Sequence, residues 1–159
     1  MKKIVSLCTA AVLCLSLLSA CGPKQAEEKQ VDLAAFAQSV QQSHEFASLE
    51  RADPADQELG TIMLENNYPG LKDMDLEQVE VYLAMVSFSG GELALVQAKS
   101  PEDAAKVKEI FQARIDTKST DGPGNYPEEV EMWKRAAKVA ENGSYVMLVN
   151  HEDSQAIVD

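Results

Sequence analysis

The sequence predicts a single α+β domain built on a four-stranded, mainly antiparallel sheet with helices packed on it. Two tight-turn signals carry this prediction, Ser89-Gly90-Gly91 and Asn142-Gly143. Each lies between two short apolar runs, which is typical of a β-hairpin. Segments with helical periodicity precede and separate the hairpins. The predicted order is therefore α-α-β-β-α-α-β-β with a helical turn or two at the end, and the two hairpins can pair edge to edge.

The chain begins with a segment that we interpret as a lipoprotein signal peptide, residues 1–20. Two lysines precede an apolar run, residues 4–18, and small residues follow it. The run is too short for a permanent membrane anchor, which needs roughly 20 apolar residues. Leu18-Ser19-Ala20-Cys21 resembles the bacterial lipobox at every position. This resemblance implies lipid transfer to the Cys21 sulfur and cleavage between Ala20 and Cys21.

Cleavage defines the organisation of the rest of the chain. It leaves 139 of the 159 residues, which suits one domain with a real core. We expect residues 21–30 to be the lipidated cysteine and a flexible tether, because residues 22–30 hold only glycine, proline, alanine and charged or amide side chains. Residues 31–159 then form the domain. Cys8 and Cys14 leave with the signal, so the mature monomer can form no disulfide.

The charge excludes one class of partner. Loss of Lys2 and Lys3 leaves 12 basic side chains against 26 acidic ones, a net charge of −14 for the mature chain. Nucleic acid and anionic lipid headgroups repel such a surface. We therefore expect no nucleic-acid partner, and we expect the lipid on Cys21 to hold the protein at the membrane.

Two helices are predicted before the first hairpin. Residues 32–48 form the first, with Asp32 as its N-cap and an apolar face made by Leu33, Phe36, Ala37 and Val40. The turn at Asp53-Pro54 precedes a second helix, residues 55–66. Gly60 weakens that second helix, because glycine has a low helix propensity.

The central hairpin and the helix after it have clearer signals. Residues 79–88 are apolar on both alternating faces, which suits a strand covered on both sides, and residues 92–98 form its partner. The third helix, residues 101–118, begins with a serine N-cap at Ser100, a proline and two acidic residues.

The last part of the domain is predicted to contain a helix, a second hairpin and a terminal helical turn. Residues 128–136 form the fourth helix, which Pro127 opens. The second hairpin then pairs residues 137–141 with residues 144–149. Residues 152–157 make the terminal helical turn.

Several segments together resemble the small bacterial lipoproteins classed as domain of unknown function 4358. The resemblance covers residues 31–158 and rests on the order and spacing of these segments. The segments are Val31-Asp32-Leu33, Glu92-Leu93-Ala94-Leu95-Val96, the helix Val107 to Ile115 with Arg114, Tyr126-Pro127-Glu128 and Asn142-Gly143-Ser144-Tyr145-Val146. It implies an envelope location and one α+β domain, and it carries over no catalytic residue.

Few residues are candidates for a site. Asp73, Asp75 and Glu77 alternate as calcium ligands often do, but the spacing lacks the glycine and distal glutamate of an EF-hand loop. Tyr126 and Trp133 are seven residues apart on one helical face, so they either cover the sheet or form an exposed aromatic rim for a ligand.

Other site chemistries have no motif in this sequence. His44 and His151 lack a metal-ligand spacing, and we expect both to be solvated. No nucleophile motif or phosphate-binding loop is present. We therefore expect no cofactor and name no catalytic residue.

The sequence favours one function class over another. We expect a lipid-anchored, extracytoplasmic binding or interaction module that engages another envelope protein or a small ligand. The alternative is a carboxylate-dependent hydrolase acting on envelope polymers, for which the acidic composition is the only motive. A cavity with two carboxylates about 5 to 10 Å apart would favour the hydrolase.

Overall fold

The computed structural model describes residues 30–85, 91–120, 122 and 124–159. Val31–Asp159 form one compact unit. The predicted signal peptide, the lipobox with Cys21 and nearly all of the tether lie outside the described residues. The same holds for the end of the first predicted hairpin strand and most of its turn, residues 86–90. In the described part of the chain, no helix is both long enough and apolar enough to cross a bilayer.

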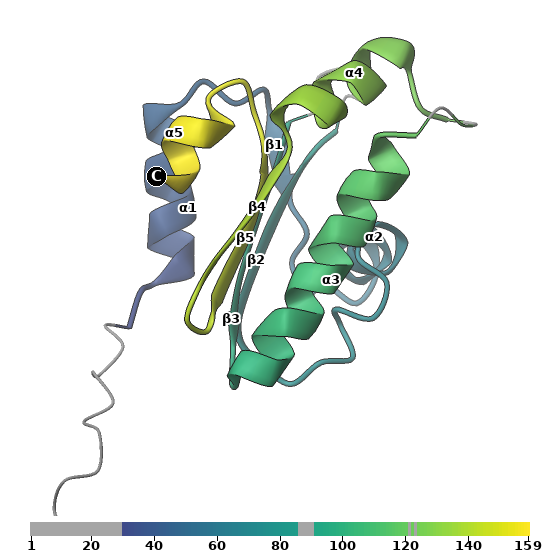
Figure 1. The fold of residues 1–159 in the computed structure, drawn as a ribbon. Helices are drawn as coiled ribbons and strands as arrows, with labels where there is room; N and C mark the ends of the chain where they lie inside the picture. The colour runs from purple at the N-terminus through teal and green to yellow at the C-terminus, as the bar shows by residue number, and fades with distance from the viewer. Residues whose placement is uncertain (1–29, 86–90, 121, 123) are drawn as a thin grey trace, which may run out of the picture. The chain divides into compact units, whose positions relative to one another are not determined.

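The domain is built on one antiparallel sheet with the strand order β1-β2-β3-β5-β4 (Figure 1). The strands are β1 Leu49–Arg51, β2 Leu76–Ala84, β3 Glu92–Ala98, β4 Lys138–Asn142 and β5 Tyr145–Asn150. The hairpins β2–β3 and β4–β5 pair through β3 and β5, with Leu95 opposite Met147. The α+β class is confirmed, and the two hairpins do pair edge to edge.

The prediction of four strands is wrong, because β1 adds a fifth at the edge of the sheet. It has three residues, with Leu49 opposite Ala84 and Arg51 opposite Tyr82 of β2. A strand this short shows too little alternation to be recognised in the sequence. It forms because the chain after the first helix runs alongside β2, which supplies the hydrogen-bond partners.

Helices cover both faces of the sheet (Figure 1). On one face lie α1 and α5, and on the other lie α2, α3 and α4. The helices are α1 Leu33–Ser43, α2 Leu59–Asn67, α3 Pro101–Lys118, α4 Pro127–Ala136 and α5 Ser154–Val158. Two of these helices, α1 and α3, begin at the N-cap residues that were predicted. Asp32 accepts a hydrogen bond from the Ala35 N–H at 3.0 Å, and Ser100 Oγ accepts one from the Asp103 N–H at 3.1 Å.

Each face of the sheet has its own apolar core. Alternation along β3 divides them, because Leu93 and Leu95 face α1 while Ala94 and Val96 face the other helices. The larger core, under α2, α3 and α4, has as its largest buried side chains Trp133, Tyr68, Phe111, Leu64 and Leu71. β3 is thus the central strand, covered on both sides.

The start of α2 differs from the prediction because a turn replaces its first part. The Asp53 carboxylate accepts a hydrogen bond from the Ala55 N–H at 2.9 Å, and the Asp53 carbonyl accepts one from the Asp56 N–H at 3.0 Å. The helix packs tightly on this turn: a Cβ at Gly60 would lie 2.0 Å from the Asp53 carbonyl oxygen. Gly60 therefore allows the close approach, although its low helix propensity argued against a helix here.

Candidate functional site

A cavity of about 270 Å³ opens where the β2–β3 hairpin meets the ends of three helices. We call it the charged cavity. The lining comes from α2, the last residues of β2, the first residue of β3, α3 and α4. Its apolar wall is made by Met63, Leu83, Ala84 and Met85, and its polar wall by Asn67, Glu92, Arg114, Lys118 and Glu129.

The first ion pair of the charged cavity joins β3 to α3. Glu92, the first residue of β3, is 3% exposed. Arg114 donates to it through two nitrogens, Nη2 to Oε2 at 2.7 Å and Nε to Oε1 at 3.0 Å. The hydroxyl of Tyr68 donates to Oε1 as well. Both oxygens of this buried carboxylate are thereby engaged, which offsets its desolvation.

The protonation states in this group have identifiable causes. Burial raises the pKa of Tyr68 well above its usual range, and the charge of Glu92 raises it further, so the hydroxyl keeps its proton. Burial acts to lower the pKa of Arg114, but the hydrogen bonds and charge of Glu92 outweigh it and hold the pKa above its ordinary value. The guanidinium also lies 5.8 Å from the ring centre of Tyr68 and 5.4 Å from that of Trp133, within cation–π range.

The second ion pair joins α3 to α4. Lys118 Nζ lies 2.6 Å from Glu129 Oε1, and the two side chains are only 15% and 5% exposed. Lys118 is the last residue of α3 and Glu129 is in the first turn of α4. Each charge therefore opposes the partial charge of its own helix end, which stabilises the pair further. Lys118 follows Arg114 by four residues, so one face of α3 presents both cations.

Two buried polar atoms at this place have no hydrogen-bond partner among the described residues. They are Glu129 Oε2 and, one turn further along α4, Trp133 Nε1. An unpartnered buried polar atom costs about 1–3 kcal/mol. Glu129 lines the cavity, and its unpartnered oxygen is a buried acceptor beside it. The arrangement is suited to bind a small molecule through hydrogen bonds.

Comparison with known proteins places the chain in a family. The family model described as Domain of unknown function (DUF4358) matches residues 52–151. The chain belongs to this family. Every lining residue of the charged cavity lies within the DUF4358 match. No curated protein and no solved structure matches the chain.

The aromatic rim predicted from Tyr126 and Trp133 is not formed. Trp133 is 1% exposed and packs in the larger core, whereas Tyr126 is 54% exposed. The reason is that Tyr126 is the N-cap of α4 with extended backbone angles, so helical spacing does not apply to it. Of the two alternatives in the sequence, Trp133 covers the sheet of the DUF4358 domain and Tyr126 points to solvent.

The acidic residues predicted as weak calcium ligands do not form a site, whereas the two histidines come together. Asp73, Asp75 and Glu77 are exposed, and Asp75 pairs with Lys99 at 2.5 Å. They do not converge as a metal site: in the described part of the chain, the metal-binding geometry occurs at His44, His151 and Asp153 instead. The sequence had left both histidines as separate solvated residues. Cys21 and Ala20 lie outside the described residues.

Sequence reasoning missed the residues of the charged cavity. Arg114 and Glu92 appeared only within segments that resemble DUF4358, and neither was named as a site residue. One signal was available: Arg114 and Lys118 lie four residues apart in the predicted helix, so they share one of its faces. The carboxylates that pair with them come from β3 and α4, so only the folded chain identifies them.

Proposed function

We propose that the protein is a lipid-anchored extracytoplasmic module of the cell envelope, and that it binds a small polar ligand in the charged cavity. The lipobox and the short apolar run support the anchor, and the acidic surface supports anchoring by lipid rather than by charge. The observation that carries the binding role is the buried, unpartnered oxygen of Glu129, a residue that lines a cavity with an apolar wall. Ligand sites combine these two features.

The chemistry of the cavity indicates what the ligand presents. The unpartnered atom is an acceptor on a carboxylate, so a ligand that reaches it needs an N–H or O–H donor, as an amine or a sugar hydroxyl has. The methionine side chains of Met63 and Met85 form an adaptable apolar wall for the carbon skeleton. At about 270 Å³, the cavity suits a molecule smaller than a typical drug.

The binding role is tested by a ligand screen on two variants. We expect an amine or a sugar to bind wild-type protein in calorimetry and to bind Glu129→Gln about 10-fold more weakly, since a hydrogen bond to a charged group contributes about 1.5–3 kcal/mol. Glu128→Gln is the matched control: it removes the same charge from the neighbouring, exposed position. Equal affinity in both variants, or a flat screen together with no envelope partner in repeated pull-downs, would count against the proposal.

The anchor is tested separately, by metabolic labelling with a fatty acid. We expect Cys21→Ala to carry no label and to be released or held as the precursor. Cys8→Ala changes another cysteine of the same predicted signal, and it should be labelled like wild type. Unchanged labelling of Cys21→Ala would refute the lipoprotein interpretation.

A carboxylate-dependent hydrolase remains the second candidate, and one observation favours it. Glu92 and Glu129 line the same cavity, as a pair of catalytic carboxylates would. Both oxygens of Glu92 already accept hydrogen bonds from Arg114 and Tyr68, which leaves it badly placed to exchange protons with a substrate. Release of fragments from envelope polymers by wild type, lost in Glu129→Gln, would put the hydrolase first.

A further inference from the structure

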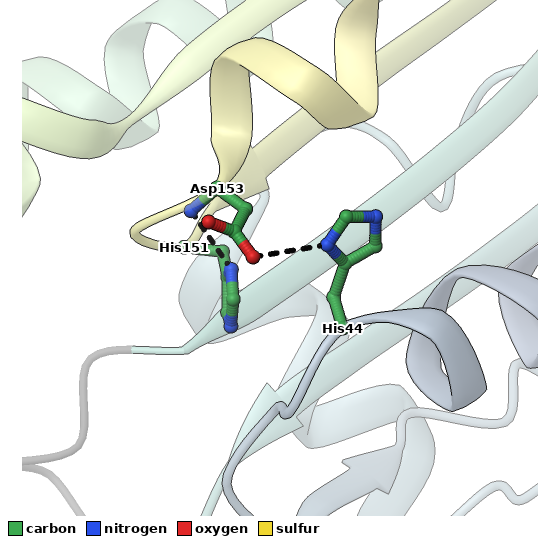
Figure 2. A group of neighbouring side chains, drawn as sticks. All are labelled: His44, His151 and Asp153. Atoms are coloured by element: carbon green, nitrogen blue, oxygen red, sulfur yellow. Dashed lines mark hydrogen bonds and ion pairs between the residues drawn. The ribbon is translucent and has the colours of Figure 1, made fainter.

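We propose that His44, His151 and Asp153 form a binding site for a divalent transition-metal ion, Zn²⁺ foremost. The three side chains converge from opposite ends of the domain sequence, His44 from the end of α1 and the other two from the turn between β5 and α5 (Figure 2). Each offers one ligand atom, and these atoms all lie within 4.8 Å of one another. The site lies outside the charged cavity and does not depend on the function proposed above.

The turn that carries two of the ligands is held firmly. Ser154 is 1% exposed, and its hydroxyl both accepts a hydrogen bond from the His151 N–H at 2.9 Å and donates one to the His151 carbonyl at 2.6 Å. Asp153 is the residue before α5. The backbone positions of His151 and Asp153 are therefore fixed relative to each other, which reduces the entropy lost on metal binding.

The third ligand is positioned by the end of the first helix. His44 is the C-cap of α1, and its N–H donates to the Val40 carbonyl at 3.0 Å. Its Nδ1 lies 3.1 Å from Asp153 Oδ2. The ring of Phe46 packs against His151 at a tilt of 37°, with 4.4 Å between ring centres, and so restricts the imidazole. Ligands held by surrounding contacts are characteristic of a preformed site.

The hydrogen bonds of His151 orient its metal-binding nitrogen. Nδ1 accepts the backbone N–H of Asp153 at 3.0 Å, so its lone pair is directed at the backbone of another ligand residue. Nε2 lies 3.4 Å from the Glu45 carbonyl, which suits the N–H of that tautomer. Metal-ligating histidines usually donate their other N–H to such a carbonyl. Metal binding would exchange the bond to the Asp153 N–H for a coordinate bond at Nδ1.

The distances need only a small adjustment. In a tetrahedral zinc site with ligands at about 2.0–2.1 Å, neighbouring ligand atoms lie about 3.3 Å apart. The 3.1 Å between His44 Nδ1 and Asp153 Oδ2 already agrees with this. The widest separation allowed by the 4.8 Å limit closes by side-chain rotation, for which Asp153 is free because its side chain is 59% exposed.

The donor set selects the class of ion and leaves a position open. Two imidazoles and one carboxylate suit Zn²⁺ and its neighbours rather than Ca²⁺ or Mg²⁺, which prefer all-oxygen sites. Three protein ligands leave the fourth tetrahedral position to water. The ion would link α1 to α5 across 109 residues of sequence and so tie together the two ends of the domain. Only His151 lies within the DUF4358 match, so we propose the site for this chain.

The test is Zn²⁺ calorimetry and thermal unfolding on the purified chain in detergent, first stripped with a chelator. We expect one ion per chain and a rise in melting temperature with Zn²⁺. His44→Ala and His151→Ala should each weaken binding by about 100-fold or more, beyond the roughly 10–100-fold that loss of an outer-shell partner costs. His44→Gln and His151→Gln serve if an alanine variant unfolds.

Two further measurements distinguish a three-ligand metal site from a simple ion pair between His44 and Asp153, in which His151 has no role. Glu152→Gln is the matched control, because it neutralises the carboxylate beside Asp153 and should leave Zn²⁺ affinity unchanged while Asp153→Asn lowers it. With Cu²⁺ as the probe, electron paramagnetic resonance should show coupling to two imidazole nitrogens, and to one in each histidine variant. Zn²⁺ binding no tighter than Ca²⁺, or wild-type affinity in His151→Ala, overturns the proposal.

Discussion

Replacing Arg114 with methionine is expected to lower the free energy of unfolding by about 3–5 kcal/mol, because removal of one partner leaves the other buried charge uncompensated. Glu92 is 3% exposed and would lose both guanidinium hydrogen bonds. The cation–π contacts to Tyr68 and Trp133 disappear as well. Urea unfolding followed by circular dichroism measures this loss.

Arg135→Met is the matched control for this experiment. Arg135 lies on α4 and pairs with Glu152 at 3.5 Å, but the two side chains are 71% and 79% exposed. An exposed pair contributes about 0–1 kcal/mol, so this variant should unfold almost like wild type. Adding Glu92→Gln to Arg114→Met should recover part of the loss, since the unpaired charge is then removed. Similar losses in the two arginine variants would show that the cavity ion pair has no special role in stability.

Replacing Trp133 with alanine is expected to cost about 3–5 kcal/mol, because the change empties a large part of the core beneath α4. Trp133 is 1% exposed and packs with the residues of the larger cluster. It also faces the Arg114 guanidinium, which would lose one aromatic neighbour. Chemical unfolding followed by circular dichroism is the appropriate measurement, since Trp133 is the single tryptophan of the chain.

Tyr126→Ala is the control variant that distinguishes a buried Trp133 from one in an exposed aromatic rim. Tyr126 is 54% exposed, and a surface substitution of this kind changes stability by about 0.5 kcal/mol or less. If the two aromatic residues formed one exposed rim, both variants would keep their stability and both would lose ligand binding. A small cost for Trp133→Ala would therefore contradict its place in the core.

The elements that sequence reasoning placed best are those with local signals. The strand Glu92–Ala98 and the helix ending at Lys118 agree with the structure to the residue. Ser100 caps that helix through the Asp103 N–H, three residues away, and Gly143 adopts the positive φ of 60° that a hairpin turn needs. Such signals act over a few residues, so they can be recognised without knowing the fold.

The edge strand β1 and the start of α2 lacked such signals. β1 depends on the exposed edge of β2. The Ala52 N–H, one residue beyond β1, also donates a hydrogen bond to this edge at 2.8 Å. The late start of α2 depends on the turn at Asp53, against which Gly60 packs. In both cases a tertiary contact overrides a weak local preference.

By itself, the sequence determined the α+β class, most element boundaries and the family resemblance, because capping, turn chemistry and periodicity are written in neighbouring residues. The lipobox at Cys21 stays a prediction of the same local kind. Only the tertiary structure decided the two sites. Glu92 meets Arg114 across 22 residues, and His44 meets Asp153 across 109. Side chains so far apart in sequence come together only through the order of the strands and the faces that the helices cover, and neither is encoded in any short stretch of chain.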